Sequence, residues 1–148
     1  MPPIVWTIGY ERLLPDELVA ELRAARVERL IDVRYRPQSR RAGMSKTRLG
    51  ERLAGEGIAY EHRRALGTPA DIRWFYKHNQ NAEGQARFAD HVERESAEDL
   101  DALADELRAP ATPRTALMCL EADPAVCHRR TLTEHLRERV PDLKVVDL

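Results

Sequence analysis

Cys127-His128-Arg129 places a thiol, an imidazole and a guanidinium in adjacent positions of this chain. The tripeptide follows an acidic loop from Glu121 to Pro124, and the sequence after it has the periodicity of a helix. The free N–H groups at the start of a helix carry partial positive charge, so they attract anions and lower the pKa of a thiol. We therefore expect a functional site here, with Cys127 either as a nucleophile or as a residue that orients the loop.

Polar side chains also follow the apolar runs that we expect to be strands. Gly9 and Tyr10 stand at the end of the first run, Asp32 and Arg34 at the end of the second, and Glu121 at the end of the fourth. The carboxyl ends of parallel strands share one edge of a sheet, and ligands bind beyond that edge. The sequence therefore predicts one pocket with the tripeptide in one of its walls.

Two carboxylates in this pocket are candidates for proton transfer, because burial raises the pKa of a carboxyl group and neighbouring arginines lower it. Glu121 is the stronger candidate, since it opens the loop that carries Cys127. For Asp32, a structural role as a loop cap or as the partner of Arg34 or Arg129 is an equal alternative. The predicted catalytic residues are Asp32, Glu121, Cys127 and His128.

Arginines would bind the substrate, because a guanidinium pairs with phosphate in a bidentate manner and keeps its charge when partly buried. We expect Arg34, Arg40 and Arg129 to form an anion clamp, with Ser39 as an additional hydrogen-bond donor. The predicted substrate-binding residues are Gly9, Tyr10, Arg34, Ser39, Arg40 and Arg129.

The elements that must position these residues alternate between short apolar runs and stretches of helical periodicity. Strands are expected at residues 4–8, 29–33, 58–60, 115–120 and 143–146. Helices are expected from Pro15, and over residues 45–54, 83–95, 97–108 and 128–138, whereas residues 71–81 could form a helical turn or a lid. This pattern predicts an α/β fold: a single three-layer domain over residues 1–148, with a mainly parallel sheet of about five strands and helices on both faces.

Several known sites are disfavoured by spacing. Cysteine phosphatases have an arginine at a fixed offset after the nucleophilic cysteine, where this chain has Ala125 or Thr133. Rhodanese-like chemistry is supported only by an analogy of fold, through the end of the second strand. Neither Gly-x-Gly-x-x-Gly nor Gly-x-x-x-x-Gly-Lys occurs, which disfavours dinucleotide binding and ATP hydrolysis.

No cofactor is expected. Cys119, Cys127, His128 and His135 are potential ligands, but the chain has no close Cys-x-x-Cys pair and no His-Glu-x-x-His motif. This absence disfavours structural zinc. A catalytic metal held by Glu121, Cys127 or His128 is the alternative.

Composition indicates a soluble globular protein, with 43% hydrophobic and 33% charged residues and a net charge of −1. No apolar run approaches the roughly 20 residues that cross a bilayer, and no signal peptide is visible, so we expect a cytoplasmic protein that does not bind membranes. Two cysteines in that compartment are expected to be reduced rather than paired, with Cys119 packed in the core. Residues 34–64 contain nine Lys or Arg against three Glu, a basic stretch that could contact nucleic acid.

An ordered set of short motifs, spread over nearly the whole length, resembles the domain-of-unknown-function family DUF488. These motifs are Thr7-Ile8-Gly9-Tyr10, Asp32-Val33-Arg34, Pro37-x-Ser39-Arg40, Gly57-Ile58-x-Tyr60, Leu66-Gly67, Leu117-Met118-Cys119-x-Glu121, Asp123-Pro124 and Cys127-His128-Arg129. Tyr10 departs from the family pattern, which often has histidine there. The resemblance implies a small bacterial or archaeal α/β protein and brings no settled activity.

Three functions follow from these observations. The first is an enzyme that acts on an anionic substrate, phosphorylated or nucleotide-like, in the pocket at the strand ends. The second is a non-catalytic module that binds a nucleotide in the same pocket, or nucleic acid through the basic loop at residues 34–46. The third is thiol or sulfur-transfer chemistry at Cys127.

Overall fold

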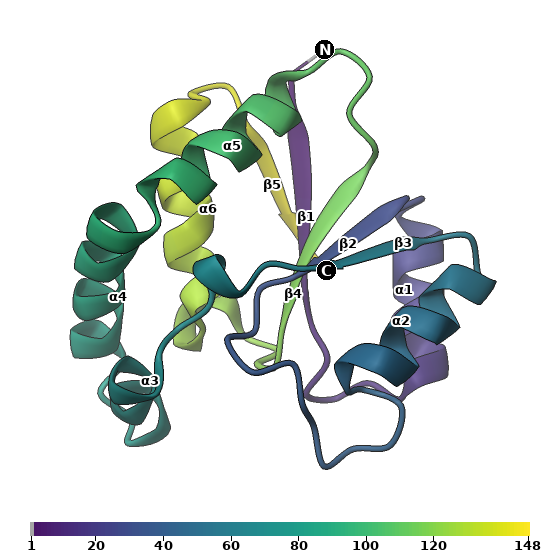
Figure 1. Ribbon diagram of the computed structural model, residues 1–148, viewed down its shortest axis with the longest axis horizontal. Helices are drawn as coiled ribbons and strands as arrows, with labels where there is room; N and C mark the ends of the chain where they lie inside the picture. The colour runs from purple at the N-terminus through teal and green to yellow at the C-terminus, as the bar shows by residue number, and fades with distance from the viewer. Residues whose placement is uncertain (1) are drawn as a thin grey trace.

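Five apolar segments form one sheet in the computed structural model, which describes residues 2–148 (Figure 1). The strands are β1 (Ile4–Gly9), β2 (Arg29–Asp32), β3 (Ala59–His62), β4 (Thr115–Cys119) and β5 (Lys144–Asp147). Their spatial order is β3-β2-β4-β1-β5, and every neighbouring pair is parallel. The predicted α/β fold is confirmed, and the described sheet is parallel throughout.

Helices connect the strands. They are α1 (Pro15–Ala24), α2 (Lys46–Gly55), α3 (Ala70–Lys77), α4 (Asn81–Glu95), α5 (Ala97–Arg108) and α6 (His128–Arg139), with short 3-10 helices η1 (Arg64–Leu66) and η2 (Pro124–Val126). Almost all of α3 lies within residues 71–81, the segment for which the sequence allows either a helical turn or a lid. Among residues 2–148, no helix combines the length and the apolar character that crossing a bilayer requires.

The starts of α1 and α2 show how the sequence sets the helix boundaries. Pro15 occupies the first position of α1, where proline has no hydrogen bond to lose, and the Glu17 carboxylate accepts the Leu14 N–H at 2.8 Å. Ser45 stands at the predicted N-cap of α2, but its Oγ accepts the Ser39 N–H at 3.0 Å and caps no N–H of its own helix. The Ser45 hydroxyl therefore holds the loop between β2 and α2.

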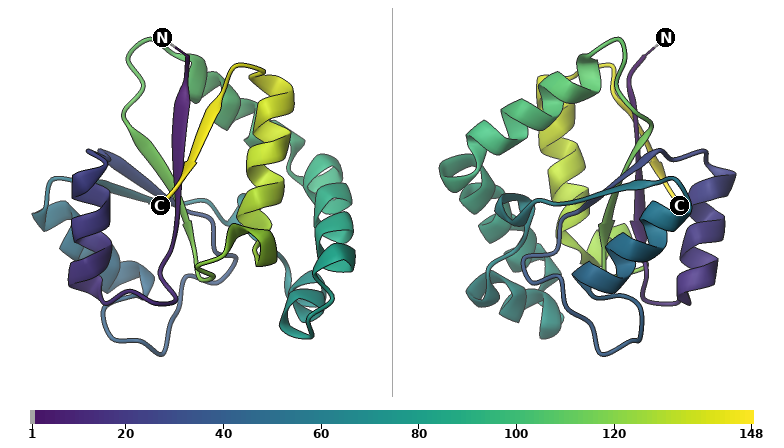
Figure 2. Two further views of the ribbon diagram at one scale, coloured as in Figure 1. Left: turned by 180° about the vertical axis from the view of Figure 1, so that it is seen from behind. Right: turned by 45° about the vertical axis from the view of Figure 1, so that its right-hand side comes forward.

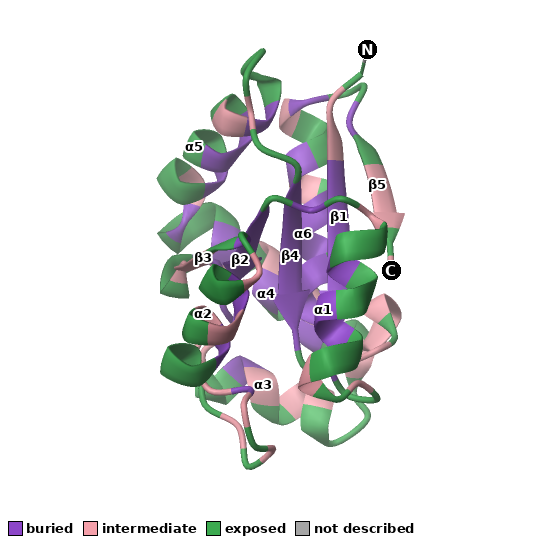
Figure 3. Cartoon of the chain, turned by 90° about the vertical axis from the view of Figure 1, so that its right-hand side faces the viewer, coloured by how far each residue is buried: buried purple, intermediate pink, exposed green. Residues whose placement is uncertain are grey.

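Helices cover both faces of the sheet and give a three-layer arrangement (Figure 2). One buried apolar cluster joins α1 and α2 to the strands, and a second joins α4, α5 and α6 to the opposite face. Alternate residues of β4 belong to different clusters: Leu117 faces α4–α6, whereas Ala116 and Met118 face α1 and α2. Burial is therefore concentrated in the sheet and on the inner helix faces, as Figure 3 shows.

The order of the strands locates a crevice at the carboxyl end of β4. The helices that follow β1 and β2 cover one face, whereas α6, which follows β4, covers the other. Loops that leave neighbouring strands toward opposite faces separate and open a crevice, which is where ligands bind in such sheets. Gly9 pairs in register with Cys119, and Asp32 with Met118, so the ends of β1, β2 and β4 meet at this edge.

Candidate functional site

A cavity of about 300 Å³ lies at this edge of the sheet, with walls from the ends of β1, β2 and β4, the loop after β2, α3, and the start of α6. Its lining residues are Tyr10, Arg34, Tyr35, Arg36, Gln38, Thr68, Arg73, Tyr76, Lys77, Cys119, Leu120, Glu121, Val126, Cys127 and His128. Five of the ten predicted site residues are among them. The cavity stands at the position that the strand order indicates, so we take it as the candidate functional site.

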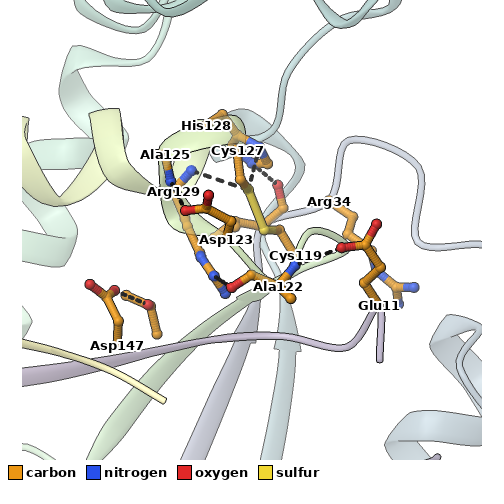
Figure 4. Close-up of a disulfide and its surroundings, with 12 residues drawn as sticks. Glu11, Arg34, Cys119, Ala122, Asp123, Ala125, Cys127, His128, Arg129 and Asp147 are labelled. Carbon is orange, nitrogen blue, oxygen red and sulfur yellow. Dashed lines mark hydrogen bonds between the residues drawn. A yellow bond between two sulfur atoms is a disulfide. The ribbon is translucent and has the colours of Figure 1, made fainter. Parts of the chain in front are cut away.

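Cys119 and Cys127 are joined by a disulfide in the wall of the cavity (Figure 4). The sequence prediction of reduced cysteines is therefore wrong for this structure. β4 ends at Cys119, the chain reverses through η2, and Cys127 immediately precedes α6, so residues eight apart in sequence come together. Both cysteines also belong to the buried apolar cluster on the α4–α6 face, which agrees with the expected packing role of Cys119.

Cys127 caps α6. Its Sγ accepts the backbone N–H of Arg129 at 3.5 Å, a long contact that suits sulfur. The thiol of a reduced Cys127 would lie in the positive field of the helix N-terminus, which favours the thiolate. Cys119 ends a strand and has no such field.

The imidazole of His128 lies between Cys127 and Val33, the residue that follows β2. Its Nε2 lies 2.8 Å from the Val33 carbonyl oxygen, and because a carbonyl only accepts, Nε2 carries the hydrogen. Burial lowers the pKa of His128 to about 4, so the ring is neutral near pH 7. The other nitrogen, Nδ1, is then an unprotonated acceptor, and it lies 3.7 Å from Cys127 Sγ. Phe88 packs edge-on against the ring, with centroids 5.2 Å apart, and fixes its orientation.

Glu121 lies beside both sulfurs. One of its carboxylate oxygens and the sulfur atoms of Cys119 and Cys127 all lie within 4.8 Å of one another. Burial raises the pKa of the Glu121 carboxyl group, and the charge of Glu11 adds to this effect, while Arg73 and Arg129 oppose it. Glu121 therefore holds a proton at a higher pH than an exposed glutamate does.

The stability of the fold should consequently depend on the ionisation of Glu121. A raised carboxyl pKa means that the folded state binds the proton more tightly than the unfolded chain, so this stabilisation is complete below the unfolded pKa of about 4.3. It is lost as pH rises through the raised folded pKa. In urea unfolding at a series of pH values, the wild type should lose stability relative to Glu121→Gln across that window. Parallel pH curves for the two proteins would contradict the raised pKa.

Asp32 and Arg34 form a buried ion pair below the cavity. Asp32 is fully buried, and its carboxylate accepts the Arg34 side chain through Nε at 2.9 Å and Nη2 at 2.7 Å. It also accepts the Arg34 backbone N–H at 3.0 Å and the hydroxyl of Tyr60. Burial lowers the pKa of Arg34, but the hydrogen bonds and charge of Asp32 outweigh it and raise that pKa. Asp32 does not line the cavity, so the geometry supports its structural alternative over proton transfer.

The expected clamp of three arginines is not assembled. Arg34 lines the cavity but is engaged by Asp32, and Arg40 is exposed and lies outside the cavity. Arg129 is fully buried behind the loop from 120 to 126, where its Nη2 donates to the Ala122 carbonyl at 2.8 Å. In Figure 4 the disulfide separates Arg34 from Arg129. Burial lowers the pKa of Arg129, whose Nε and Nη1 have no partner among the described residues.

The other three predicted binding residues differ in their positions. Tyr10 lines the cavity, and its hydroxyl accepts Nη1 of Arg34 at 3.2 Å. Gly9 lies against the loop that carries Glu121 and does not line the cavity. Ser39 is also outside the cavity, where its Oγ accepts the Arg41 N–H at 3.1 Å.

The cluster of Cys119, Glu121 and Cys127 has donor atoms that suit a transition metal. The disulfide withdraws both sulfurs from coordination, because the metal ligand is a thiolate. The residues would fit a metal ion only after reduction, when two thiolates and a carboxylate would face the same space.

One family model matches most of the chain. The family model described as "Domain of unknown function DUF488" matches residues 15–136. The chain belongs to the DUF488 family. No curated protein and no solved structure matches this DUF488 chain. The matched range contains Asp32, Arg34, Glu121, Cys127 and His128, whereas Gly9 and Tyr10 precede it.

Sequence reasoning missed the residues that α3 contributes to this DUF488 site. Arg73, Tyr76 and Lys77 line the cavity, and neither basic side chain has a hydrogen-bond or ion-pair partner in the described part of the chain. Their spacing of three and four residues places them on one face of a helix. That signal becomes readable only once residues 70–77 are known to be helical.

Proposed function

We propose that this protein is an enzyme that acts on a small anionic substrate, phosphorylated or nucleotide-like, bound in the cavity at the carboxyl edge of the sheet. One observation carries the proposal: Arg73 lines the cavity without an ionic partner and lies near Glu121, whose pKa is raised. Among the described residues no carboxylate forms an ion pair with Arg73, so its guanidinium is available to a ligand, and guanidinium groups suit phosphate and carboxylate.

The surroundings of Arg73 support an anionic ligand. Arg36 and Lys77 also line the cavity and are likewise unpaired among residues 2–148, whereas the charge of Arg34 is balanced by Asp32. Glu121 is the one acidic residue that the lining contains. A volume of about 300 Å³ is at the small end of ligand sites, which suits a phosphate monoester better than a dinucleotide.

Glu121 is the proposed proton carrier. A carboxyl group with a raised pKa holds its proton to a higher pH than an exposed one, so it can donate that proton to a leaving group and later recover it. In this reading Arg73 binds the anion, Glu121 moves the proton, and His128 and Cys127 shape the wall behind them.

The binding half of the proposal is tested with inorganic phosphate and a nucleoside monophosphate in calorimetry. Arg73→Gln should weaken binding by about 10- to 100-fold, because a hydrogen bond to a charged group contributes about 1.5–3 kcal/mol. Arg40→Gln is the matched control, since it removes the same charge from an exposed arginine outside the cavity. It should bind as the wild type does.

Two results would overturn this proposal. The first is the absence of binding of either anion to the wild type. The second is an equal loss of affinity in Arg73→Gln and Arg40→Gln, which would place the anion on the general basic surface. For catalysis, Glu121→Gln should retain anion binding and lower turnover of a phosphomonoester panel by about 10²- to 10⁴-fold. Unchanged turnover would remove Glu121 from the reaction.

A further inference from the structure

We infer that Cys127 and Cys119 are a redox-active pair that exchanges with a small disulfide bearing carboxylate groups, an inference that rests on the proposed anionic ligand of the same cavity. The disulfide is one of the two states of this pair, and the dithiol is the other. Cys127 would be the attacking thiol and Cys119 the resolving one.

The position of the pair restricts what can reach it. Cys119 and Cys127 are 1% and 2% exposed, yet both line the cavity. A reacting sulfur must therefore enter through the cavity, whose volume of about 300 Å³ admits a small molecule and not a folded protein. This argues for a low-molecular-weight disulfide as the partner in exchange.

The two sulfurs have different surroundings, which assigns their roles. Cys127 Sγ accepts a backbone N–H at the start of α6, and the buried guanidinium of Arg129 adds positive charge on the same helical turn. Both features favour a thiolate, the form that attacks a disulfide. Cys119 ends β4 within the apolar cluster and lacks these features, so its thiol is suited to the second, intramolecular step.

His128 supplies a base for the attacking thiol. Because Nε2 donates to the Val33 carbonyl, Nδ1 has a free lone pair, and it lies 3.7 Å from Cys127 Sγ. The edge contact with Phe88 and the bond to Val33 hold the ring in this orientation. The lowered pKa of His128 belongs to the disulfide state; in the reduced pair, the negative charge of a Cys127 thiolate 3.7 Å from Nδ1 would favour the imidazolium, so the proton of Cys127 can pass to Nδ1 without any movement of the ring.

Glu121 supplies the second proton acceptor, since its carboxylate lies within 4.8 Å of both sulfurs. The charge of the cavity selects the partner. Arg73, Arg36 and Lys77 would attract carboxylate groups on a small disulfide, as they would a phosphate.

Oxidation of the cysteine pair requires no reagent other than the substrate disulfide. The Cys127 thiolate attacks one sulfur of the substrate disulfide, whose S–S bond breaks, and the first thiolate leaves with the proton held by His128. The Cys119 sulfur, deprotonated by Glu121, then attacks Cys127 Sγ and displaces the second thiolate, which takes that proton. The pair is oxidised by two electrons and the substrate is reduced to two thiols. A low-molecular-weight thiol returns the pair to the dithiol by the reverse reaction.

The test uses the full chain and two aliphatic probes, the anionic 3,3′-dithiodipropionate and the neutral bis(2-hydroxyethyl) disulfide. Each rate is divided by the rate of the same probe with a free monothiol, so that intrinsic reactivity cancels. Cys119→Ser should trap one equivalent of probe on Cys127, detected by mass, whereas Cys127→Ser should trap little on Cys119. The reduced wild type should release two thiols per molecule and end as the disulfide.

His128→Gln separates the base from a structural role, because the glutamine amide can still donate to the Val33 carbonyl. In Cys119→Ser, the alkylation rate of Cys127 against pH should give a thiol pKa below the ordinary 8.5. His128→Gln should raise that pKa and slow exchange at pH 7 by up to about tenfold, since a rise of one unit in a thiol pKa that lies above 7 removes about nine-tenths of the thiolate. An ordinary pKa that His128→Gln leaves unchanged would overturn the inference, as would equal trapping on the two cysteines.

The two probes distinguish this inference from the proposed function. We expect exchange with the anionic probe to be faster by about tenfold at low salt, and Arg73→Gln to remove the difference. Trapping on Cys127 with no preference between probes would overturn the assigned substrate class, and would accompany a failure of phosphate binding. Phosphate binding with an unreactive Cys127 would overturn the redox pair and leave the anion cavity standing.

Discussion

Asp32→Asn is expected to lower the free energy of unfolding by about 3–5 kcal/mol, because it leaves the buried Arg34 guanidinium without its counter-charge. Asp32 is fully buried and Arg34 is 6% exposed, so water cannot replace the lost carboxylate. Asparagine has nearly the same shape but presents one carbonyl oxygen and an amide that cannot accept. The measurement is equilibrium unfolding in urea near neutral pH.

The position of Arg34 explains why this loss would reach the cavity. Its Nη1 donates to the Met44 carbonyl at 2.8 Å and to the Tyr10 hydroxyl at 3.2 Å, so the ion pair joins the end of β2 to the following loop and to the end of β1. Asp32→Asn should therefore weaken anion binding in the cavity even under conditions in which the protein remains folded.

Asp16→Asn is the matched control. Asp16 pairs with Arg52 at the surface, with the Asp16 side chain 84% exposed, so water replaces the lost partner and the free energy of unfolding should change far less. A double variant, Asp32→Asn with Arg34→Met, should lose less than the sum of its single variants, because removing both partners leaves no unpaired charge. A loss below about 1 kcal/mol in Asp32→Asn would show that the pair is not a stabilising feature of the fold.

The elements of the fold could be predicted because their signals are local. Val5, Leu30 and Leu117 each stand in short apolar runs that chain breakers interrupt, and both faces of these strands are buried. The helix α3 has only eight residues, too few for periodicity to separate it from a turn. Its start depends on Pro69, whose carbonyl accepts the N–H groups of Ile72 and Arg73.

The sequence predicts that the site lies at the carboxyl edge of the sheet, but it does not predict how the side chains there are arranged. The strand ends indicate the edge at which Glu121 and Cys127 line the cavity, because parallel strands bring their carboxyl ends together. His128 and Arg129 are adjacent in sequence, but successive helical residues point about 100° apart, so one lines the cavity and the other lies behind it. Which of the two faces the cavity depends on how α6 packs, and no short motif records that.

The disulfide could not be anticipated from the count of cysteines. Its formation depends on the path of residues 120–126, which must reverse through η2 to bring Cys127 back to the end of β4. An expectation based on cellular compartment treats all cysteines alike. The structure shows instead that both cysteines line one cavity and are joined to each other.

Gly9→Ala is expected to destabilise the protein by about 3 kcal/mol, at the upper end of the range for overpacked sites. A Cβ at this position would overlap the carbonyl oxygen of Glu121 and lie 2.9 Å from the backbone nitrogen of Ala122. Both obstacles are backbone atoms, so no side-chain rotation relieves them, and the loop after β4 must move. That loop is held against β1 by the Glu11 N–H, which donates to the Leu120 carbonyl at 2.8 Å.

Gly55→Ala gives the matched comparison, because a Cβ there meets no atom within 4 Å. Gly55 is the last residue of α2, and alanine should stabilise the protein by about 0.4–1 kcal/mol through the smaller entropy of the unfolded chain. Urea unfolding of both variants separates a steric effect from a general effect of adding a methyl group. Because the displaced loop carries Glu121, Gly9→Ala should also weaken phosphate binding, whereas Gly55→Ala should leave it unchanged. Equal stability of the two variants would show that the close approach of β1 to this loop does not fix the position of Glu121.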